Sequence, residues 1–470
     1  MPLLCGHYDR EMIDQVQDQD QRRPRSRDRA EPPTVTHGAE ADRLVLAAET
    51  SMRTGSLTEA VSHLRDALNH APKHLRACQL LAMALELQGR RADATEAWLS
   101  VGVALESLDQ LDHAADTYRK VIARKPDCVR AHNKLGWVLL KLAKPHEAMR
   151  CFESAIAIDP ESEQLHKRLG CAALMANDEE RGWQEWGWRD GLLERHRFEQ
   201  PAWDGDVESL KGRTILTWSE FALGDSLQCL RYLSLLAQHG AKVVVEIQST
   251  LVPLVQRMPS VSEVVASGAP LPPFDIHAPL FSLAPAFQKE RLGAGIPYVE
   301  VGDDLIATWR NKLAPIPGKR HIGLTWAGSP TGSNNRYRHT SLSSYAPLAG
   351  VKDARYISLQ LGPRAADLHN PPAGLEIEPL LDESCTAADT AALMMNLDLI
   401  ISIDSMVAHL AGALARPVWC VTWLSPAWWL WHSKDDHSLW YPTMRLFQQI
   451  RAGDWQDVLV RVRAALETHR

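Results

Sequence analysis

The sequence predicts an α/β protein with an all-α repeat domain in front of it. Small residues recur 34 positions apart in the first third of the chain, a spacing typical of stacked helix pairs. Residues 397–420 (LDLIISIDSMVAHLAGALARPVWC) follow the pattern of strand, tight turn, helix and strand. A similar alternation begins at Arg213, with one helix expected over residues 225–239. Two successive parallel-sheet units are therefore expected after the repeats.

The composition is that of a folded protein. The 470 residues are 45% hydrophobic, which is enough for two or three domains with their own cores. A formal net charge of −7 argues against nucleic acid as the main partner. No basic and apolar leader opens the chain, and the uncharged run 417–431 is too short to span a bilayer. We expect a cytoplasmic protein that is not an integral membrane protein, with peripheral membrane contact left open.

The N-terminal region divides into a leader and a repeat domain. Residues 1–40 combine charged side chains, Gln and Pro with few large apolar groups, so we expect them to be disordered. Residues 41–193 have a helical pattern that resembles tetratricopeptide repeats. The recurring small residues are Ala60, Ala94, Ala114, Ala148 and Gly182. The step from Ala94 to Ala114 is only 20 residues, which leaves the helix boundaries between 91 and 109 unpredicted.

The C-terminal α/β unit carries a candidate phosphate site. Leu399–Ile403 is a near-continuous apolar run, typical of a buried parallel strand. Asp404 or Ser405 can cap the following helix, whose first N–H groups would then face a ligand at the carboxyl end of the sheet. An ordinary βαβ unit with a good cap is the alternative. A helix end contributes about 0.3–1 kcal/mol toward an anion, whereas micromolar binding needs about 8 kcal/mol, so cations must contribute as well.

Motifs spread over the α/β part carry a family resemblance. They are Glu220, Gly224-Asp225, Gln228, Arg231-Tyr232, Asp275, His277, Trp326-Ala327-Gly328, Ser358-Leu359-Gln360, Asp389-Thr390, Asp404-Ser405, His409 and Trp440-Tyr441-Pro442. Together they resemble bacterial proteins that join tetratricopeptide repeats to a domain similar to the ADP-heptose lipopolysaccharide heptosyltransferases. Some of these proteins resemble flagellin glycosyltransferases. The resemblance implies a GT-B fold of two Rossmann-like domains, here residues 194–315 on the acceptor side and 316–470 for the nucleotide-sugar donor.

The resemblance also assigns residues on the acceptor side. It places a catalytic carboxylate at Asp225, and the acceptor side would also include Glu220, Gln228 and His277. A carboxylate at the end of the first strand could take the acceptor proton. The alternative for Asp225 is a helix N-cap. Relatives tend to have Gln-Gly where this chain has Phe221-Ala222, and Ala would oppose a turn with positive φ.

The donor side is expected to be rich in phosphate-binding groups. The candidates are Arg336, Arg338, Gln360, Thr390, Asp404, Ser405 and His409. A guanidinium group suits phosphate oxygens, although a solvated loop remains the alternative for the two arginines, and packing for His409. The run Trp428–Trp431 departs from the Asp-Trp-Arg-Trp of relatives, which could change donor choice or activity.

No metal or other cofactor is expected. The eight cysteines contain no CxxC pair, so neither a zinc site nor a disulfide framework is indicated. Asp204 and Asp206 form a DxD pattern that holds a metal in some glycosyltransferases, but such pairs are common in linkers. The resemblance implies inverting transfer without a metal.

Three functions are compatible with these features. The first is a glycosyltransferase that moves a sugar from a nucleotide-sugar donor to a flagellin-like protein acceptor recruited by the repeats. The second is a protein-interaction scaffold with an inactive GT-B domain. The third is a glycosyltransferase with a saccharide acceptor of the lipopolysaccharide type. The motifs favour the first, and donor hydrolysis with and without Asp225 would separate it from the second.

Overall fold

The computed structural model describes residues 35–188, 198–287, 290, 295–328, 338–424, 436–451 and 453–468. These residues form two compact units, one made of residues 35–188 and the other of the described residues from 198 onward. Residues 1–34 of the predicted leader lie outside the described residues. Val35, rather than Ala41, is the first residue of a helix. Within the described ranges, no helix is both long and apolar enough to cross a membrane.

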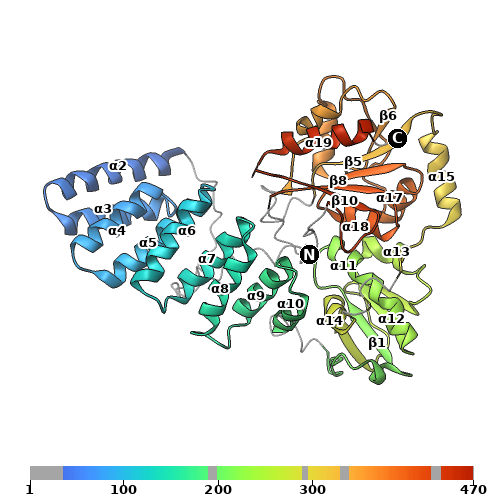
Figure 1. Cartoon of the computed structure of the whole chain (residues 1–470), viewed down its shortest axis with the longest axis horizontal. Helices are drawn as coiled ribbons and strands as arrows, with labels where there is room; N and C mark the ends of the chain where they lie inside the picture. Colours follow the sequence, from blue (N-terminus) through green and yellow to red (C-terminus); the bar gives the residue numbers. More distant parts are fainter. Residues whose placement is uncertain are drawn as a thin grey trace. The chain divides into compact units, whose positions relative to one another are not determined.

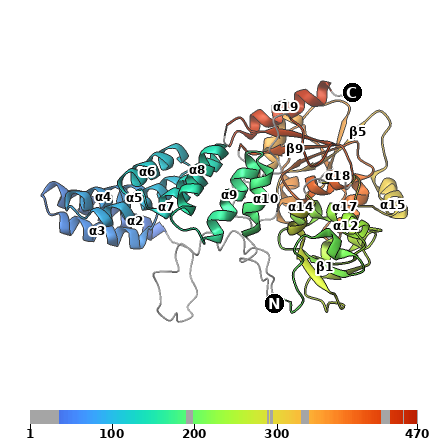
Figure 2. The same ribbon diagram turned by 60° about the horizontal axis from the view of Figure 1, so that its bottom comes forward.

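The first unit is a stack of helices, side by side in chain order in both views (Figures 1 and 2). The helices are α2 (Val35–Arg53), α3 (Leu57–His70), α4 (Leu75–Leu87), α5 (Arg91–Ser107), α6 (Leu111–Arg124), α7 (Val129–Lys141), α8 (Pro145–Ile156), α9 (Glu163–Met175) and α10 (Glu179–Trp186). Consecutive helices pack against each other throughout. The predicted all-α repeat domain is therefore confirmed.

Glycine-aromatic contacts explain why the helices pair closely. A β-carbon at Gly136 in α7 would lie 2.7 Å from the Phe152 ring in α8. The ring of Tyr118 in α6 crowds Gly102 in α5 in the same way. Both contacts join residues 16 apart, and the Gly136–Phe152 pair follows the Gly102–Tyr118 pair by 34 residues. The repeat period thus places a large ring against a bare backbone in successive helix pairs.

Helix α5 explains the irregular 20-residue step. It packs against α4 on one side and α6 on the other. Its buried Ala94 belongs to the pair with α4, and its Gly102 contacts the pair with α6. One helix therefore serves two successive repeats. The intervening helix of a regular repeat is missing, which shortens the spacing between Ala94 and Ala114.

The second unit begins with a four-stranded parallel sheet of order β3-β2-β1-β4. Its strands are β1 (Thr214–Trp218), β2 (Lys242–Ile247), β3 (Glu263–Ala266) and β4 (Ile276–Pro279). Between β1 and β2 the chain forms α11 (Leu223–Cys229), the 3₁₀ turn η4 (Leu230–Tyr232) and α12 (Leu233–Gln238). The sequence predicts one helix over residues 225–239, so the 3₁₀ turn at Arg231 is an unpredicted break.

A six-stranded parallel sheet of order β10-β9-β8-β5-β6-β7 follows. Its strands are β5 (Arg320–Thr325), β6 (Ala354–Ser358), β7 (Ile377–Pro379), β8 (Leu399–Ile403), β9 (Val418–Thr422) and β10 (Met444–Gln448). The helical elements are α15 (Asp303–Leu313), η8 (Leu342–Leu348), η9 (Pro363–His369), α17 (Ala387–Met394), α18 (Met406–Ala413) and α19 (Trp455–Thr468). Buried residues of η8 and α19 share one core cluster with β5 and β8. The two Rossmann-like halves of the predicted GT-B fold are therefore present.

Helices α11 and α18 pack against each other and join the two halves (Figure 1). Each follows a central strand of its own sheet, β1 and β8. Because a helix after a parallel strand starts at the carboxyl edge of the sheet, the two helix starts bring two carboxyl edges together. The candidate site lies where they meet.

Candidate functional site

Asp225 lies in the first turn of α11, two residues after the helix begins. Its Oδ2 accepts a hydrogen bond from the Ala222 N–H at 3.1 Å. Asp225 is therefore not the N-cap residue, although it helps to fix the helix start. Ala222 itself is extended, with φ −73°. The replacement of glycine at this position thus causes no backbone strain, contrary to the doubt raised by the sequence.

The Asp225 carboxyl has an unusual environment. Burial, together with the negative charges of Asp404 and Glu220, raises its pKa to about 7, while the hydrogen bond from the Ala222 N–H opposes this rise. The positive charge of Arg338 lowers it. Asp404 and Arg338 belong to the other half of the unit. The charges at the start of α18 therefore act on the Asp225 carboxyl. A carboxyl with a pKa near 7 is suited to general base catalysis at neutral pH.

The start of α18 has the predicted capping geometry. Ser405 is the N-cap residue, and its Oγ accepts a hydrogen bond from the Val407 N–H at 3.3 Å. The Ser402 and Ser405 hydroxyls lie 3.1 Å apart. Strand β8 covers Leu399–Ile403, as predicted, and all five of its residues are buried. The helix start is thus held rigidly at the end of a buried strand.

Arg338 is attached to the same turn. Its Nη2 donates to the Asp404 carbonyl at 3.2 Å, and its Nε lies 3.8 Å from the Asp404 carboxylate. The side chain is one-third exposed, so the guanidinium is anchored yet accessible. Arg336, the other predicted phosphate ligand, lies outside the described residues, as do Trp428–Trp431.

His409 is buried between the two halves. Its Nδ1 is 3.0 Å from the Tyr441 hydroxyl, and a β-carbon at Gly224 would lie 2.7 Å from its Cδ2. Burial, with the charges of Arg231 and Arg338, lowers its pKa to about 3. The imidazole is therefore neutral and packs in the interface. Its role as a donor ligand stays a prediction.

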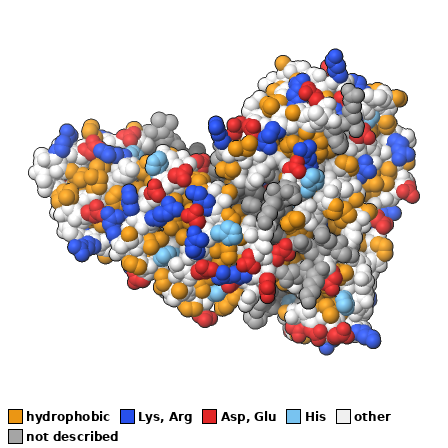
Figure 3. All heavy atoms as spheres, in the orientation of Figure 1, with side chains coloured by type: hydrophobic (Ala, Val, Ile, Leu, Met, Phe, Trp, Pro, Cys, Tyr) orange, Lys and Arg blue, Asp and Glu red, His pale blue; other side chains and the backbone are white. Residues whose placement is uncertain are grey.

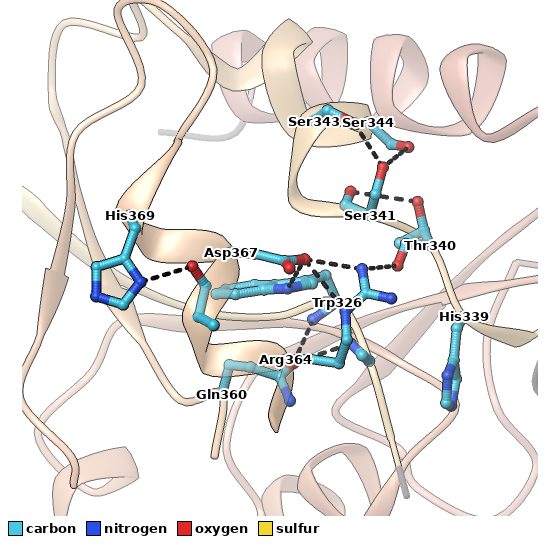
Figure 4. A network of polar contacts seen from close by, with 12 residues as sticks. Trp326, His339, Thr340, Ser341, Ser343, Ser344, Gln360, Arg364, Asp367 and His369 are labelled. Carbon is cyan, nitrogen blue, oxygen red and sulfur yellow. Dashed lines mark hydrogen bonds and ion pairs between the residues drawn. The ribbon is translucent and has the colours of Figure 1, made fainter. Parts of the chain in front are cut away.

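Gln360 and Thr390 are engaged in local structure. Gln360 Oε1 accepts from the N–H groups of Trp326 at 3.2 Å and Ala327 at 2.9 Å, which fixes the loop after β5 (Figure 4). The Thr390 hydroxyl donates to the Thr386 carbonyl at 3.2 Å within α17. Beside Gln360, Asp367 accepts from Arg364 at 2.8 Å and from the Trp326 indole at 3.0 Å (Figure 4). These contacts support the walls of the site, and donor binding by Gln360 and Thr390 stays a prediction.

The acceptor-side candidates differ in their surroundings. Glu220 Oε2 accepts from the Phe281 N–H at 2.8 Å, near Asp225. Gln228 is 1% exposed, and its Oε1 has no hydrogen-bond partner among the described residues. His277 lies in the middle of β4, where its ring contacts Phe198 at 4.9 Å and Phe274 at 6.5 Å between centroids. The structure thus brings Glu220 and Asp225 together and places His277 in an aromatic layer.

The DxD carboxylates are used by the local backbone. Asp206 caps the turn at Glu208, whose N–H donates to it at 3.1 Å. Asp204 accepts from the Asp206 N–H at 3.0 Å. The two carboxylates therefore stabilise a linker turn. Across the described residues, no group of three or more His, Cys, Asp or Glu side chains is arranged to hold a metal ion.

Arg231, for which the sequence predicts no role, lies in a buried aromatic cluster. Its guanidinium lies among three aromatic rings, that of Tyr298 from the same half and those of Trp440 and Tyr441 from the other half. One signal was available: Arg231 interrupts an otherwise apolar helical stretch, LRYLSLL. A charge in such a position is costly unless it has partners.

Comparisons with known proteins agree with this architecture. Residues 102–163 match the tetratricopeptide repeat family. Protein FlbA of Caulobacter vibrioides is 22% identical over 439 residues, which cover 87% of this chain and 72% of FlbA.

Two solved structures are similar to the α/β part. A family 9 glycosyl transferase from Veillonella parvula has 12% identity and a TM-score of 0.43, and the match covers 55% of this chain and 97% of that one. The ADP-heptose lipopolysaccharide heptosyltransferase II of E. coli has 16% identity and a TM-score of 0.39, covering 54% and 99%. The chain joins tetratricopeptide repeats to an α/β part built on two parallel sheets.

Proposed function

We propose that this protein transfers a sugar from a nucleotide-sugar donor to an acceptor hydroxyl, with Asp225 as the general base. The observation that carries the proposal is the pairing of Asp225, whose pKa is raised to about 7, with Asp404 and Arg338 at the start of α18. A base and an anion-binding helix end on opposite walls match the needs of direct displacement. The resemblance carried by the motifs of the α/β part supports the same reaction class.

The proposed transfer inverts the anomeric carbon and needs no metal. The acceptor oxygen attacks that carbon while its proton passes to Asp225, and the bond to the leaving diphosphate oxygen breaks on the opposite face. The negative charge of the leaving diphosphate would be stabilised by Arg338, by Arg336 and by the first N–H groups of α18. Asp404, Ser405 and Arg338 form the donor side, with Gln360, Thr390 and His409 as further proposed contacts.

The proposed acceptor is a protein bound by the repeats. On the face shown in Figure 3, charged and hydrophobic side chains are interspersed over this unit. Half-buried Trp137 is flanked by Lys141 at 5.9 Å and Arg168 at 5.6 Å from its ring centroid. Such a surface offers both apolar and charged contacts to a peptide. Trp137→Ala should then reduce modification of a protein acceptor and leave donor hydrolysis unchanged.

The deciding experiment compares the full chain with Asp225→Asn on a panel of nucleotide sugars. Donor consumption is measured with and without EDTA, and cellular proteins are compared by intact mass with and without this chain. We expect Asp225→Asn to lower turnover by roughly 10²–10⁴ with donor affinity nearly intact. We also expect EDTA to have no effect.

Other outcomes of these experiments would contradict a specific part of the proposal. Full turnover by Asp225→Asn would remove the proposed base, and loss of activity in EDTA would require a metal. A wild-type chain that neither binds nor consumes any donor would favour the scaffold. Modification of a saccharide in place of a protein would move the acceptor to the lipopolysaccharide type.

A further inference from the structure

Arg231 is a buried cation at the junction of the two Rossmann-like halves. The residue is 2% exposed and lies in η4, directly after the helix that carries Asp225. Its Nε donates to the Gln228 carbonyl at 3.0 Å, its Nη1 to the Trp440 carbonyl at 2.9 Å, and its Nη2 to the Tyr298 hydroxyl at 3.4 Å. One guanidinium thus bonds to three separate segments of the unit.

Aromatic rings replace the water that this cation has lost. The guanidinium carbon lies 5.1 Å from the Tyr298 ring centroid, 5.3 Å from that of Trp440 and 4.9 Å from that of Tyr441. Each distance is within the range of a cation–π interaction. No carboxylate of the described residues forms an ion pair with Arg231, so its charge is balanced by carbonyl oxygens and ring faces.

These contacts connect Arg231 to both walls of the proposed site. Tyr441 hydrogen-bonds to His409 of α18, and the His409 ring lies against Gly224, the residue before Asp225. The Tyr298 N–H donates to the Ala413 carbonyl at the end of α18, at 3.2 Å. The path from Arg231 therefore runs through α18 and returns to the start of α11.

The geometry points to Arg231 as a positioning residue that holds α11 against α18, so that Asp225 stays opposite the donor helix. This inference rests on the proposed function. The contacts need the planar fork of a guanidinium, because a lysine ammonium could not bond to all three segments and lie among three rings at once. The 3₁₀ turn at Arg231 directs its side chain toward Trp440 and Tyr441 of the other half. A 3₁₀ stretch inside a helical segment often marks a functional position.

The test compares Arg231→Lys with Arg445→Lys in the full chain. Arg445 also lies over aromatic rings, 4.7 Å from Phe447 and 5.9 Å from Trp419, but it is 39% exposed and stays within one half. We expect Arg231→Lys to lower kcat by about 10²-fold, because a displacement of the base of about 1 Å has that effect. Donor affinity should change less than about twofold, and Arg445→Lys should behave as wild type.

The pH profile separates positioning from general loss of stability. Asp225 is faced by Glu220 from its own half and by Asp404 and Arg338 from the other, with neutral His409 beside Gly224. Separation of the halves would expose Asp225 to water and remove the charge of Asp404. The acid limb of the kcat profile should therefore move to lower pH in Arg231→Lys. A lower kcat with an unmoved acid limb would overturn the inference.

Two further measurements keep the inference testable. Tyr298→Phe removes one hydroxyl contact and keeps the ring, so it should fold and shift the acid limb in the same direction by a smaller amount. Hydrogen exchange of α11 and α18 needs no catalysis, and both helices should lose protection in Arg231→Lys. Unchanged protection would overturn the inference. If the wild-type chain has no transferase activity but Arg231→Lys still causes this loss of protection, only the proposed function is overturned.

Discussion

The ring of His409 lies so close to the backbone of Gly224 that a β-carbon at position 224 would be 2.7 Å from the His409 Cδ2 atom. The ring cannot easily move, because it is 3% exposed and hydrogen-bonded to Tyr441. This contact sets how closely α11, which carries the proposed base, approaches α18, which starts at the proposed donor site. It is therefore a sensitive point for substitution.

We predict that Gly224→Ala destabilises the α/β unit despite the better helix propensity of alanine. The gain from propensity is about 1 kcal/mol, whereas overpacking costs about 1–3 kcal/mol. Denaturant unfolding of the full chain would measure the difference. Gly187→Ala is the matched control, since a β-carbon there meets nothing within 4 Å. The double variant Gly224→Ala/His409→Ala should lose less than the sum of the two single changes.

We predict that Asp225→Asn stabilises the protein, increasingly so as the pH rises. The ordinary pKa of the carboxyl is 3.8, and burial raises it to about 7 in the folded state. Below pH 4 both states are protonated and the wild type has no penalty. Between pH 4 and 7 the unfolded chain loses its proton first, so folding stability falls, by at most about 4 kcal/mol.

Thermal unfolding of the two proteins at pH 4 and pH 8 checks this prediction. The melting temperature of Asp225→Asn should match that of the wild type at pH 4 and exceed it at pH 8. Equal differences at both pH values would mean that Asp225 ionises normally in the folded protein.

Donor affinity should fall as the pH rises through 7. A bound diphosphate adds negative charge near Asp225 and raises its pKa further, so the protonated enzyme binds donor more tightly. The dissociation constant should increase by up to about tenfold for each unit of that added shift. Calorimetric titration at pH 6 and pH 8 would measure it, with Asp225→Asn as the variant that should show no such dependence. His339 and His409 remain neutral here, because burial holds their pKa values near 4 and 3.

Arg338→Ala should weaken donor binding by about 10- to 100-fold. A charge-assisted hydrogen bond contributes about 1.5–3 kcal/mol, and Arg338 lies at the head of α18 with one-third of its side chain exposed. Titration with a nucleotide sugar and with the free nucleotide diphosphate would measure the loss, with Arg445→Ala as the control. If the affinity were unchanged, the phosphate site would have to lie elsewhere.

The sequence predicted the local parts of this site well. Strand β8 and the Ser405 cap follow from a continuous apolar run and from a hydroxyl at the turn, and both signals lie within a few residues. Strand β10 was missed because Met444–Gln448 is a short edge strand with an arginine inside it. The break at Arg231 was missed because an apolar helical pattern continues through it.

The electrostatic part of the site could not be predicted locally. Asp225 and Asp404 are 179 positions apart, and the raised pKa depends on the burial of the first and the charge of the second. Likewise, the sequence predicts Gln360 as a donor contact, but only the structure shows that its side-chain oxygen accepts hydrogen bonds from two backbone N–H groups. These interactions can be assigned only from the tertiary structure, because they join residues that are far apart in the sequence.

The helix α5 that belongs to two repeats has a consequence for unfolding. In a regular solenoid each repeat can fray separately, because neighbours are coupled only through an interface of finite strength. Here the repeats on either side of α5 share this one continuous helix. Neither repeat can therefore unfold without unfolding part of the other. The segment from α4 to α6 should therefore open as one cooperative block, with the ends of the array fraying before it.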